Sequence, residues 1–370
     1  MAHRTKPPFR ADHVGSLLRP PEVKKAREDL AAGRIGAVEL RAVEDAAIRN
    51  LVKMQEEAGL EAVTDGEVRR RSWHMDFIYQ IGGVAKSDDK VQVHFHGDQG
   101  DIDFSVDGIK ITRPLTLERT IFGEDFQFLK GVAKATPKQT IPAPSMIHRR
   151  SGPNFPGKAY PDIAQFWHDV AAVYGEEIER LGKLGCTYLQ LDDTTYATLC
   201  DPAERAAMTR NGVDGERIHL TYIRLINDAL KRKPAGMTVC THSCRGNFRS
   251  SWNASGAYDF LAEALFNELA VDGFFLEYDD ARSGGFEPLR FVPKGKMVVL
   301  GLVTTKKGAL EMKDDLKRRI DEAAKYVPLD QLCLSPQCGF SSTMEGNALT
   351  PAEQAAKLRL VVETAREVWG

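Results

Sequence analysis

The stretch DIAQFWHDVAAVYGEEIERLGKLGCTYLQL, residues 162–191, carries the local pattern from which we predict the fold. Apolar residues recur every three or four positions from Asp162 to Leu184, as on the buried face of an amphipathic helix. Thr187–Leu191 is then a short apolar run with the length of a buried strand. A helix followed directly by a buried strand is typical of an α/β fold, in which helices cross over between parallel strands.

The same alternation of short apolar runs and longer amphipathic segments extends in both directions along the chain. The candidate strands lie near His13–Gly15, Glu61–Thr64, Gln139–Ala143, Thr187–Leu191, Met237–Thr241, Gly273–Leu276, Met297–Leu300 and Gln331–Leu334. Eight such units predict a (β/α)8 TIM barrel. The sequence has no internal repeat and no linker, so we expect a single domain over residues 1–370.

One insertion departs from a plain barrel. Residues 91–121, VQVHFHGDQGDIDFSVDGIKITRPLTLERTI, alternate apolar and polar side chains around Gly and Asp-Gly turns. This pattern predicts an inserted antiparallel β-hairpin between the second and third barrel strands. We expect the hairpin to act as a lid or as an interface arm.

The composition excludes several classes of partner. The chain has 370 residues, with 50 Lys and Arg against 52 Asp and Glu, and a net charge of -2. Such a balance supplies no basic field for nucleic acid or for an anionic membrane. The sequence has no signal-peptide pattern and no apolar stretch of about 18 residues, so we expect a cytoplasmic enzyme with reduced cysteines. Its expected partners are small molecules or a second copy of itself in a homo-oligomer.

The strongest chemical signal is a Thr-His-Ser-Cys motif that directly follows an apolar run. His242 and Cys244 are two positions apart, and such residues of an extended segment project to the same side. An imidazole and a thiolate suit zinc better than calcium or magnesium. Glu277 and Cys338 also follow strand runs and could join them at the C-terminal end of the barrel. Alternatively, Glu277 caps a helix or pairs with Arg282, and Cys338 is a small core residue.

Six motifs in this order resemble the catalytic domain of cobalamin-independent methionine synthase, and more closely its short, single-barrel relatives. The motifs are His13-Val14-Gly15-Ser16, Asp65-Gly66-Glu67, Gln190-Leu191-Asp192-Asp193, His242-Ser243-Cys244, Glu277 with Arg282 five residues later, and Pro336-Gln337-Cys338-Gly339. The resemblance runs through the whole chain. It implies zinc (Zn2+) bound through His242, Cys244, Glu277 and Cys338.

The resemblance further implies that homocysteine is held by the backbone of Val14–Ser16, with Glu67 and Asp192 near its ammonium group. We place Asp192 among both the substrate-binding and the catalytic residues. The residue types agree, since two carboxylates at strand ends make a cation site and backbone N–H groups can bind a carboxylate. The alternative for both acidic residues is an ion pair with an arginine such as Arg69.

The resemblance weakens near the mouth of the barrel. The family has a tryptophan against which a pterin packs, but residues 144–150 contain none, so His148 or Arg149 is expected either to contact the donor or to orient a loop. Lys306 occupies the position of the family's catalytic histidine. It could act as an acid with a lowered pKa or bind an anionic group as a fixed charge. The additional N-terminal domain of the family has no counterpart in this sequence, which leaves the methyl donor open.

The predicted function is zinc-dependent transfer of a methyl group from a methylated donor, such as 5-methyltetrahydrofolate, to homocysteine, forming methionine. Zinc would stabilise the acceptor thiolate near neutral pH. The alternative is another zinc-dependent thiol alkyltransferase, such as epoxide:coenzyme M transferase, although the carboxylates of Glu67 and Asp192 favour an amino acid over a sulfonate. A third possibility is a non-catalytic barrel with a structural zinc, since four protein ligands close a zinc site.

Overall fold

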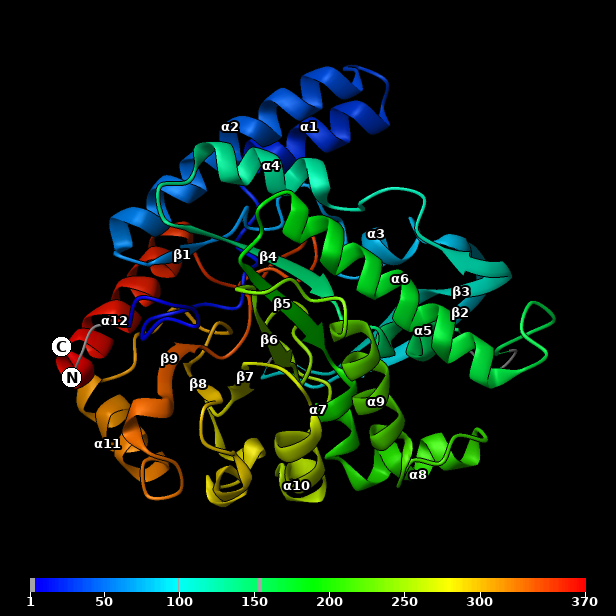
Figure 1. Ribbon diagram of the computed structural model, residues 1–370. Helices are drawn as coiled ribbons and strands as arrows, with labels where there is room; N and C mark the ends of the chain where they lie inside the picture. Colours follow the sequence, from blue (N-terminus) through cyan, green and yellow to red (C-terminus); the bar gives the residue numbers. More distant parts are fainter. Residues whose placement is uncertain (1–3, 99, 152–154) are drawn as a thin grey trace.

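The computed structural model describes residues 4–98, 100–151 and 155–370, with a curled parallel sheet at its centre (Figure 1). Seven strands make this sheet, in the order β1-β4-β5-β6-β7-β8-β9. Their bounds are β1 Ala62–Val63, β4 Thr136–Pro142, β5 Tyr188–Asp193, β6 Thr238–Ser243, β7 Gly273–Glu277, β8 Met297–Val303 and β9 Leu332–Pro336. Every neighbouring pair is parallel, so the C-terminal ends of all seven strands meet at one edge.

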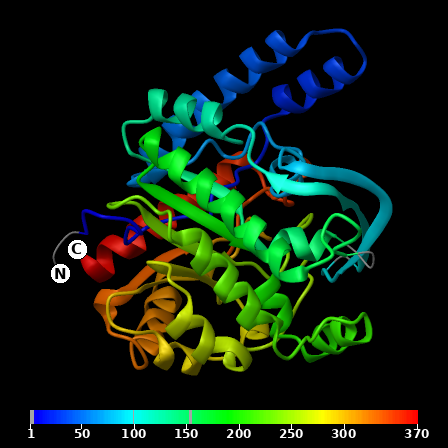
Figure 2. The ribbon, with the colours of Figure 1, turned by 45° about the vertical axis from the view of Figure 1, so that its right-hand side comes forward.

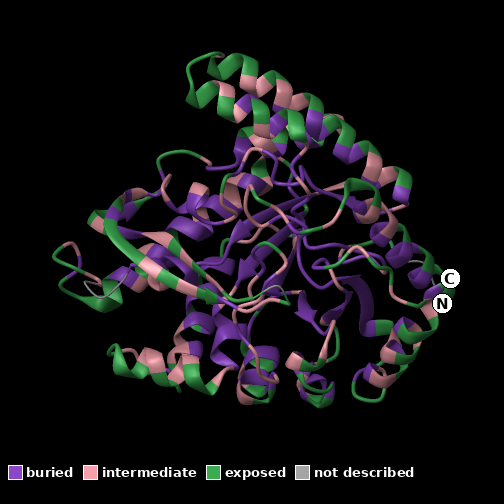
Figure 3. Cartoon of the chain, turned by 180° about the vertical axis from the view of Figure 1, so that it is seen from behind, coloured by how far each residue is buried: buried purple, intermediate pink, exposed green. Residues whose placement is uncertain are grey.

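Helices surround the sheet, and Figure 3 shows buried strands at the centre with exposed residues on the outer helices. The strands are buried because helices cover one face and side chains from facing strands fill the other. In the described part of the chain, no helix is long and apolar enough to cross a membrane. The helices are α1 Pro21–Ala31, α2 Ala37–Ala58, α3 Met75–Ile78, α4 Gly123–Val132, α5 Ser145–Arg150, α6 Ile163–Lys183, α7 Thr195–Leu199, α8 Pro202–Arg210, α9 Ile218–Leu230, α10 Asp259–Glu268, α11 Lys313–Ala323 and α12 Pro351–Trp369, with 3-10 turns η1 Ala281–Ser283, η2 Glu287–Phe291 and η3 Leu329–Gln331.

Helix α6 illustrates how local sequence sets these elements. Asp162 caps it, since its side chain accepts a hydrogen bond from the Ala164 backbone N–H at 2.9 Å. The helix ends shortly before Gly185, whose φ of 93° is left-handed and does not continue a helix. The observed range lies within one residue of the predicted range at each end.

Seven of the eight predicted strands coincide with strands of the sheet. The expected first strand, His13–Gly15, is wrong, because these residues form no strand, and the isolated bridge to β9 in this part of the chain is made by Ala11 with Leu334. Gly15 has a φ of 141°, outside the range that extended strand pairing uses. Beyond it, the Leu17 backbone N–H donates to the Gly66 carbonyl at 3.0 Å, just past β1. The N-terminal segment therefore lies between the two edge strands of the sheet.

A buried ion pair fixes this N-terminal segment. Lys138 Nζ on β4 lies 3.1 Å from Asp12 Oδ1, and neither side chain is exposed to solvent. Asp12 also accepts hydrogen bonds from the Tyr188 hydroxyl at 2.8 Å and the Phe9 backbone N–H at 3.1 Å. Lys138 donates to the His13 carbonyl at 2.5 Å. Buried charges are tolerated when they are paired and hydrogen-bonded, so this network ties the segment to β4 and β5.

A two-stranded antiparallel arm, β2 Gly82–Phe95 with β3 Ile102–Thr116, lies between β1 and β4 in the chain. It begins nine residues before the predicted range of 91–121. The register of β2 shifts between Lys86 and Lys90, and this irregularity interrupts the alternation that marks a strand. In Figure 2 the arm, drawn in cyan, curves along one side of the molecule.

The free end of the arm docks on loops that follow the sheet. His96 and Trp252 exchange backbone hydrogen bonds of 2.6 and 2.8 Å. Asn253 Nδ2 donates to the His94 carbonyl at 2.7 Å. Lys307 Nζ, beyond β8, lies 2.6 Å from a carboxylate oxygen of Asp98. The arm therefore bridges the C-terminal edge of the sheet.

Replacing Lys138 by Met leaves the Asp12 carboxylate buried without its cation. We expect the free energy of unfolding, measured by denaturant titration, to fall by about 3–5 kcal/mol. The double variant Asp12→Asn/Lys138→Met should be more stable than Lys138→Met alone, because it removes the unpaired charge. Lys25→Met, at the exposed pair with Asp29, is the control and should cost less than about 1 kcal/mol. Unchanged stability in Lys138→Met would contradict the role given to the pair.

Glu177 on α6 generates a pH dependence. Its carboxylate accepts hydrogen bonds from the backbone N–H groups of Ile121 at 3.0 Å and Phe122 at 3.4 Å, and burial raises its pKa to about 7. The folded protein therefore keeps a proton on Glu177 up to about pH 7, whereas the unfolded chain loses it near pH 4.5. The stability that this proton contributes is complete below pH 4.5 and is lost as the pH rises to about 7.

The variant Glu177→Gln stays neutral at every pH, and its amide oxygen can still accept hydrogen bonds. We expect the unfolding free energy of the wild type, relative to this variant, to fall by about 3 kcal/mol between pH 4.5 and 8. Glu176→Gln, at a partly exposed position of the same helix, is the matched control and should show a much smaller change. Parallel pH profiles for the wild type and Glu177→Gln would show that the buried carboxyl makes no such contribution.

Candidate active site

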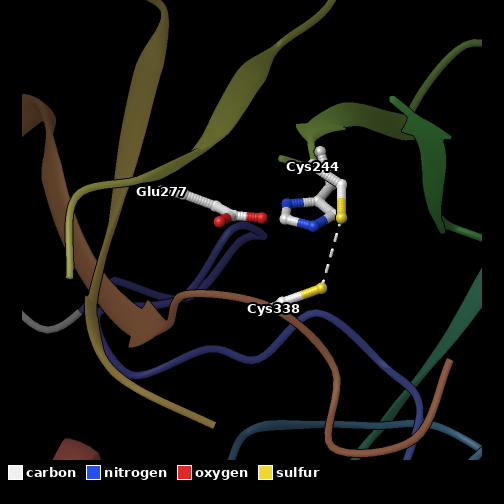
Figure 4. A group of neighbouring side chains, drawn as sticks. Cys244, Glu277 and Cys338 are labelled. Carbon is white, nitrogen blue, oxygen red and sulfur yellow. Dashed lines mark hydrogen bonds between the residues drawn. The ribbon is translucent and has the colours of Figure 1, made fainter. Parts of the chain in front are cut away.

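Four metal-ligating side chains meet at the C-terminal edge of the sheet. His242 and Glu277 lie at the ends of β6 and β7, while Cys244 and Cys338 lie one and two residues past β6 and β9. Each offers one ligand atom, and these atoms all lie within 4.8 Å of one another. Figure 4 shows Cys244, Glu277 and Cys338 pointing toward a common centre. The structure thus brings together the four residues that the sequence analysis assigned to zinc.

The arrangement fits a zinc ion. The two sulfur atoms are 3.5 Å apart and belong to free thiols. Two Zn–S bonds of about 2.3 Å at a tetrahedral angle would place them about 3.8 Å apart. Among the described residues, neither ring nitrogen of His242 nor Oε2 of Glu277 has a hydrogen-bond partner, although both side chains are buried. Buried polar atoms are seldom left unpaired, so these atoms indicate a ligand between them.

Buried hydrogen bonds hold the residues on both sides of Cys338. Gln337 Oε1 accepts from the Thr305 backbone N–H at 2.8 Å and from its hydroxyl at 2.7 Å. Asn247 Nδ2, three residues past Cys244, donates to the Gly339 carbonyl at 2.6 Å. The sequence analysis missed these residues, because their partners lie far away in the chain. The one local signal was the position of Asn247 just beyond the His-Ser-Cys motif.

Gly339 lets the N-terminal segment approach the thiols. A Cβ atom at Gly339 would lie 1.9 Å from Ser16 Oγ, so a larger residue does not fit. The Phe340 backbone N–H donates to the Ser16 carbonyl at 2.9 Å. Ser16 is therefore held directly against the segment that carries Cys338.

The ionisable groups around the thiols shift one another's pKa values. Burial favours the neutral form of Lys306, but Glu277, Asp279 and Cys338 outweigh it, so the pKa of Lys306 lies above its ordinary value. This direction is opposite to the lowered pKa considered from the sequence and favours Lys306 as a fixed charge. The hydrogen bond from Cys244 holds the pKa of Cys338 well below its usual range, with contributions from the nearby His242 imidazole and then from Lys306. Burial raises the pKa of Glu277 to about 7.

A cavity of about 570 Å³ opens onto the thiol pair. Its lining contains an aromatic wall, made by side chains of the arm and of neighbouring loops, together with polar groups at the strand ends. The predicted site residues in its lining are Val14, Ser16, Glu67, Asp192, His242, Cys244 and Cys338. The aromatic residues are Trp73, His74, Tyr79, Phe95, Phe104 and Phe248.

Glu67 and Asp192 bring two carboxylates to the cavity wall. Glu67 Oε1 accepts from the Thr140 hydroxyl at 2.9 Å and lies 3.2 Å from Arg70 Nη1, so its ion pair is with Arg70 and not with Arg69. Among the described residues, Glu67 Oε2 has no hydrogen-bond partner. Burial raises the pKa of Asp192 to about 7, and the Glu67 carboxylate adds to this. A cationic group of a ligand would relieve both carboxylates.

Four predicted site residues are not among the described residues that line the cavity. His148 Nδ1 lies 2.7 Å from the Tyr222 hydroxyl, so its ring packs among helices, and the geometry does not support the expected contact with a donor. Its neighbour Arg149 lines the cavity, because successive residues of α5 face different directions. Besides His148, the predicted residues outside the lining are Gly15, Glu277 and Lys306.

Comparison with known proteins assigns this architecture to a family. The family model described as the catalytic domain of the cobalamin-independent synthase matches residues 9–367. The chain belongs to the cobalamin-independent methionine synthase family. Members of this family are methyltransferases of the methionine synthase type, so the chain is an enzyme of that class. The resemblance inferred from the six motifs is confirmed.

Relatives match the chain over nearly its full length. The "Uncharacterized protein YxjG" of Bacillus subtilis (strain 168) is 48% identical over 368 residues, which cover 99% of this chain and 96% of that protein. The methionine synthase of Pyrococcus abyssi is 25% identical over 339 residues, covering 88% and 85%. A crystal structure of a candidate vitamin-B12 independent methionine synthase from Listeria monocytogenes has 38% identity and a TM-score of 0.77, covering 99% and 100%. The family fold therefore spans the whole chain.

Substitution of Gly339 tests the contact between Ser16 and the thiol segment. We expect Gly339→Ala to cost about 1–3 kcal/mol of unfolding free energy and to displace Cys338, which lowers metal uptake at the four-ligand site. Adding Ser16→Ala should restore part of both, since it removes the clashing Oγ. Gly131→Ala is the matched control, because a Cβ there meets nothing within 4 Å. Full metal uptake by Gly339→Ala would argue against the contact as a determinant of the site.

Proposed function

We propose that this enzyme transfers a methyl group from a methylated donor, such as 5-methyltetrahydrofolate, to the thiol of homocysteine, forming methionine. The observation that carries the proposal is a four-ligand metal site that shares one cavity with two carboxylates. The metal site explains why the acceptor would be a thiol. The two carboxylates explain why the acceptor would be an amino acid, since they can bind its ammonium group.

The residues that would hold zinc are His242, Cys244, Glu277 and Cys338. When bound, zinc supplies stabilisation of a thiolate at neutral pH, which makes a substrate sulfur nucleophilic. The imidazole and both cysteines line the cavity, whereas the Glu277 carboxylate is fully buried behind it. A substrate sulfur in the cavity therefore reaches the cysteine side of the site. Lys306, on the buried side, would balance the negative charge of the ligands.

The amino acid end of homocysteine would lie next to the thiol end. Asp192 on β5 is the register partner of His242 on β6, so the carboxylate and the imidazole stand on adjacent strands. Asp192 and Glu67 would bind the ammonium group, and Glu67 Oε2 has a free acceptor position for it. The backbone of Val14–Ser16 would bind the carboxylate. These contacts orient the sulfur toward the donor.

The aromatic wall suits a flat methylated donor. Phe104 and Phe248 have ring centroids 4.3 Å apart, and Phe95 lies 5.4 Å from Phe248. Trp73 lines the same cavity and offers the tryptophan that residues 144–150 lack. Since Phe95 and Phe104 belong to the arm, the arm would exclude water from the sulfur while it packs on the donor.

The cavity also bears on the two alternatives. Another zinc-dependent thiol alkyltransferase, such as epoxide:coenzyme M transferase, would need cations for a sulfonate beside the thiols. Although Arg71, Arg149 and Arg150 belong to the cavity lining, the group on the strand next to His242 is the Asp192 carboxylate. A purely structural zinc would need no adjoining cavity, whereas this site opens onto one. The first comparison favours an amino acid thiol as substrate, and the second favours a catalytic over a structural zinc.

The proposal is tested by zinc content and calorimetric homocysteine binding in the wild type and in Cys338→Ala. We expect the variant to hold one zinc ion fewer per chain, because it loses the thiolate ligand of Cys338. It should also lose homocysteine binding, because the substrate sulfur then has no zinc ion to bind. Cys333→Ala is the matched control, since Cys333 is a buried cysteine of β9, the strand that precedes Cys338, and lies outside the cluster.

Methyl transfer to homocysteine is then assayed with 5-methyltetrahydrofolate as donor. Product formed by the wild type and by Cys333→Ala, but not by Cys338→Ala, would support the proposal. If the wild type holds zinc but does not bind homocysteine, the substrate is another thiol, and coenzyme M is then tested as the ligand. Equal zinc content in the wild type and Cys338→Ala would overturn the proposal.

A further inference from the structure

A second cluster of metal-ligating side chains lies at the free end of the arm. His94 lies on β2, and His96 lies one residue past its end and bridges to Trp252, so the two are alternate residues of an extended segment that share a face; Asp101 directly precedes β3. Each offers one ligand atom, and these atoms lie within 4.8 Å of one another. The cluster shares no residue with the four-ligand site and, among the described residues, none with the cavity lining.

The distances within the cluster match those around a tetrahedral ion. The two carboxylate oxygens of Asp101 lie 3.2 Å from His94 Nε2 and 3.2 Å from His96 Nδ1. Bonds of about 2.0–2.1 Å at the tetrahedral angle place neighbouring ligand atoms about 3.3–3.4 Å apart. Each imidazole thus stands at ligand spacing from the Asp101 carboxylate, and a fourth position is left for water.

A further carboxylate orients one of the imidazoles. His94 Nδ1 donates to Asp103 Oδ1 at 2.7 Å, which directs the other ring nitrogen, Nε2, toward Asp101. Metal-bound histidines usually donate their second N–H to a carboxylate in this way. The side chains of His94 and His96 are 48% and 40% exposed, so an ion in solution can reach them.

The cluster stands where the arm meets the body of the enzyme. His96 exchanges backbone hydrogen bonds with Trp252, and its ring packs on the indole with centroids 4.7 Å apart. On the same stretch of the arm, Phe95 and Phe104 face the cavity. Anything that fixes His94 and His96 therefore also fixes the aromatic wall.

We propose that His94, His96 and Asp101 bind a second zinc ion, which holds the arm in its closed position over the cavity. Imidazole and carboxylate ligands in a tetrahedral arrangement suit zinc, whereas magnesium and calcium take six or more oxygen ligands. The proposal does not depend on methyl transfer, because none of its ligands belongs to the four-ligand site.

Zinc titration of the full-length protein by calorimetry tests the proposal. We expect two ions per chain in the wild type, one in His94→Ala, one in Cys338→Ala and none in the double variant. Asp103→Asn keeps all three ligands and should weaken binding at the arm about 10–100-fold. His168→Ala is the matched control, since this exposed histidine also contacts a carboxylate but lies outside the cluster.

Hydrogen exchange reports on the arm itself. Zinc should slow exchange of the His96 and Trp252 amides in the wild type and in Cys338→Ala, but not in His94→Ala. A failure of the four-ligand site alone would leave one ion in the wild type, which His94→Ala would abolish. Equal zinc binding by His94→Ala and His168→Ala, or exchange that zinc does not change in Cys338→Ala, would overturn the arm site.

Discussion

The ion pair between Asp12 and Lys138 is the constraint on which the candidate site depends. Both charges are fully buried, so the pair survives only because each partner is also hydrogen-bonded to the strands or to the N-terminal segment. This tie places the segment between the edge strands β9 and β1. The next residues, Val14 and Ser16, then reach the cavity wall, where Ser16 meets Gly339.

Buried polar groups fall into two kinds, those that have hydrogen-bond partners and belong to the fold, and those that keep an unpaired atom and are candidates for function. Lys138 and Glu177 are buried and have partners, which makes them parts of the fold. His242, Glu277 and Lys306 are equally buried, yet each keeps an atom with no partner among the described residues. Stability alone would select against such atoms, so their gathering at one edge of the sheet indicates a binding role.

The sheet and the arm divide the work of the proposed mechanism. The strand ends fix the metal ligands and both carboxylates, because seven parallel strands leave their termini little freedom. The free end of the arm is tied to the loops by the His96–Trp252 pairing, a hydrogen bond from Asn253 and the ion pair of Lys307 with Asp98. In the proposed mechanism the rigid strand ends would therefore orient the acceptor. The arm would move away to admit the donor and then close to exclude water.

The sequence by itself determined seven strand positions and the convergence of His242, Cys244, Glu277 and Cys338. Local periodicity reports burial, and parallel strands bring their ends to one edge, so residues just past each apolar run meet whatever their separation in the chain. Only the tertiary structure decided that the first segment is not a strand, that His148 turns toward Tyr222, and that the arm begins at residue 82. These outcomes depend on which distant groups pack and hydrogen-bond together, and a local pattern does not record those partners.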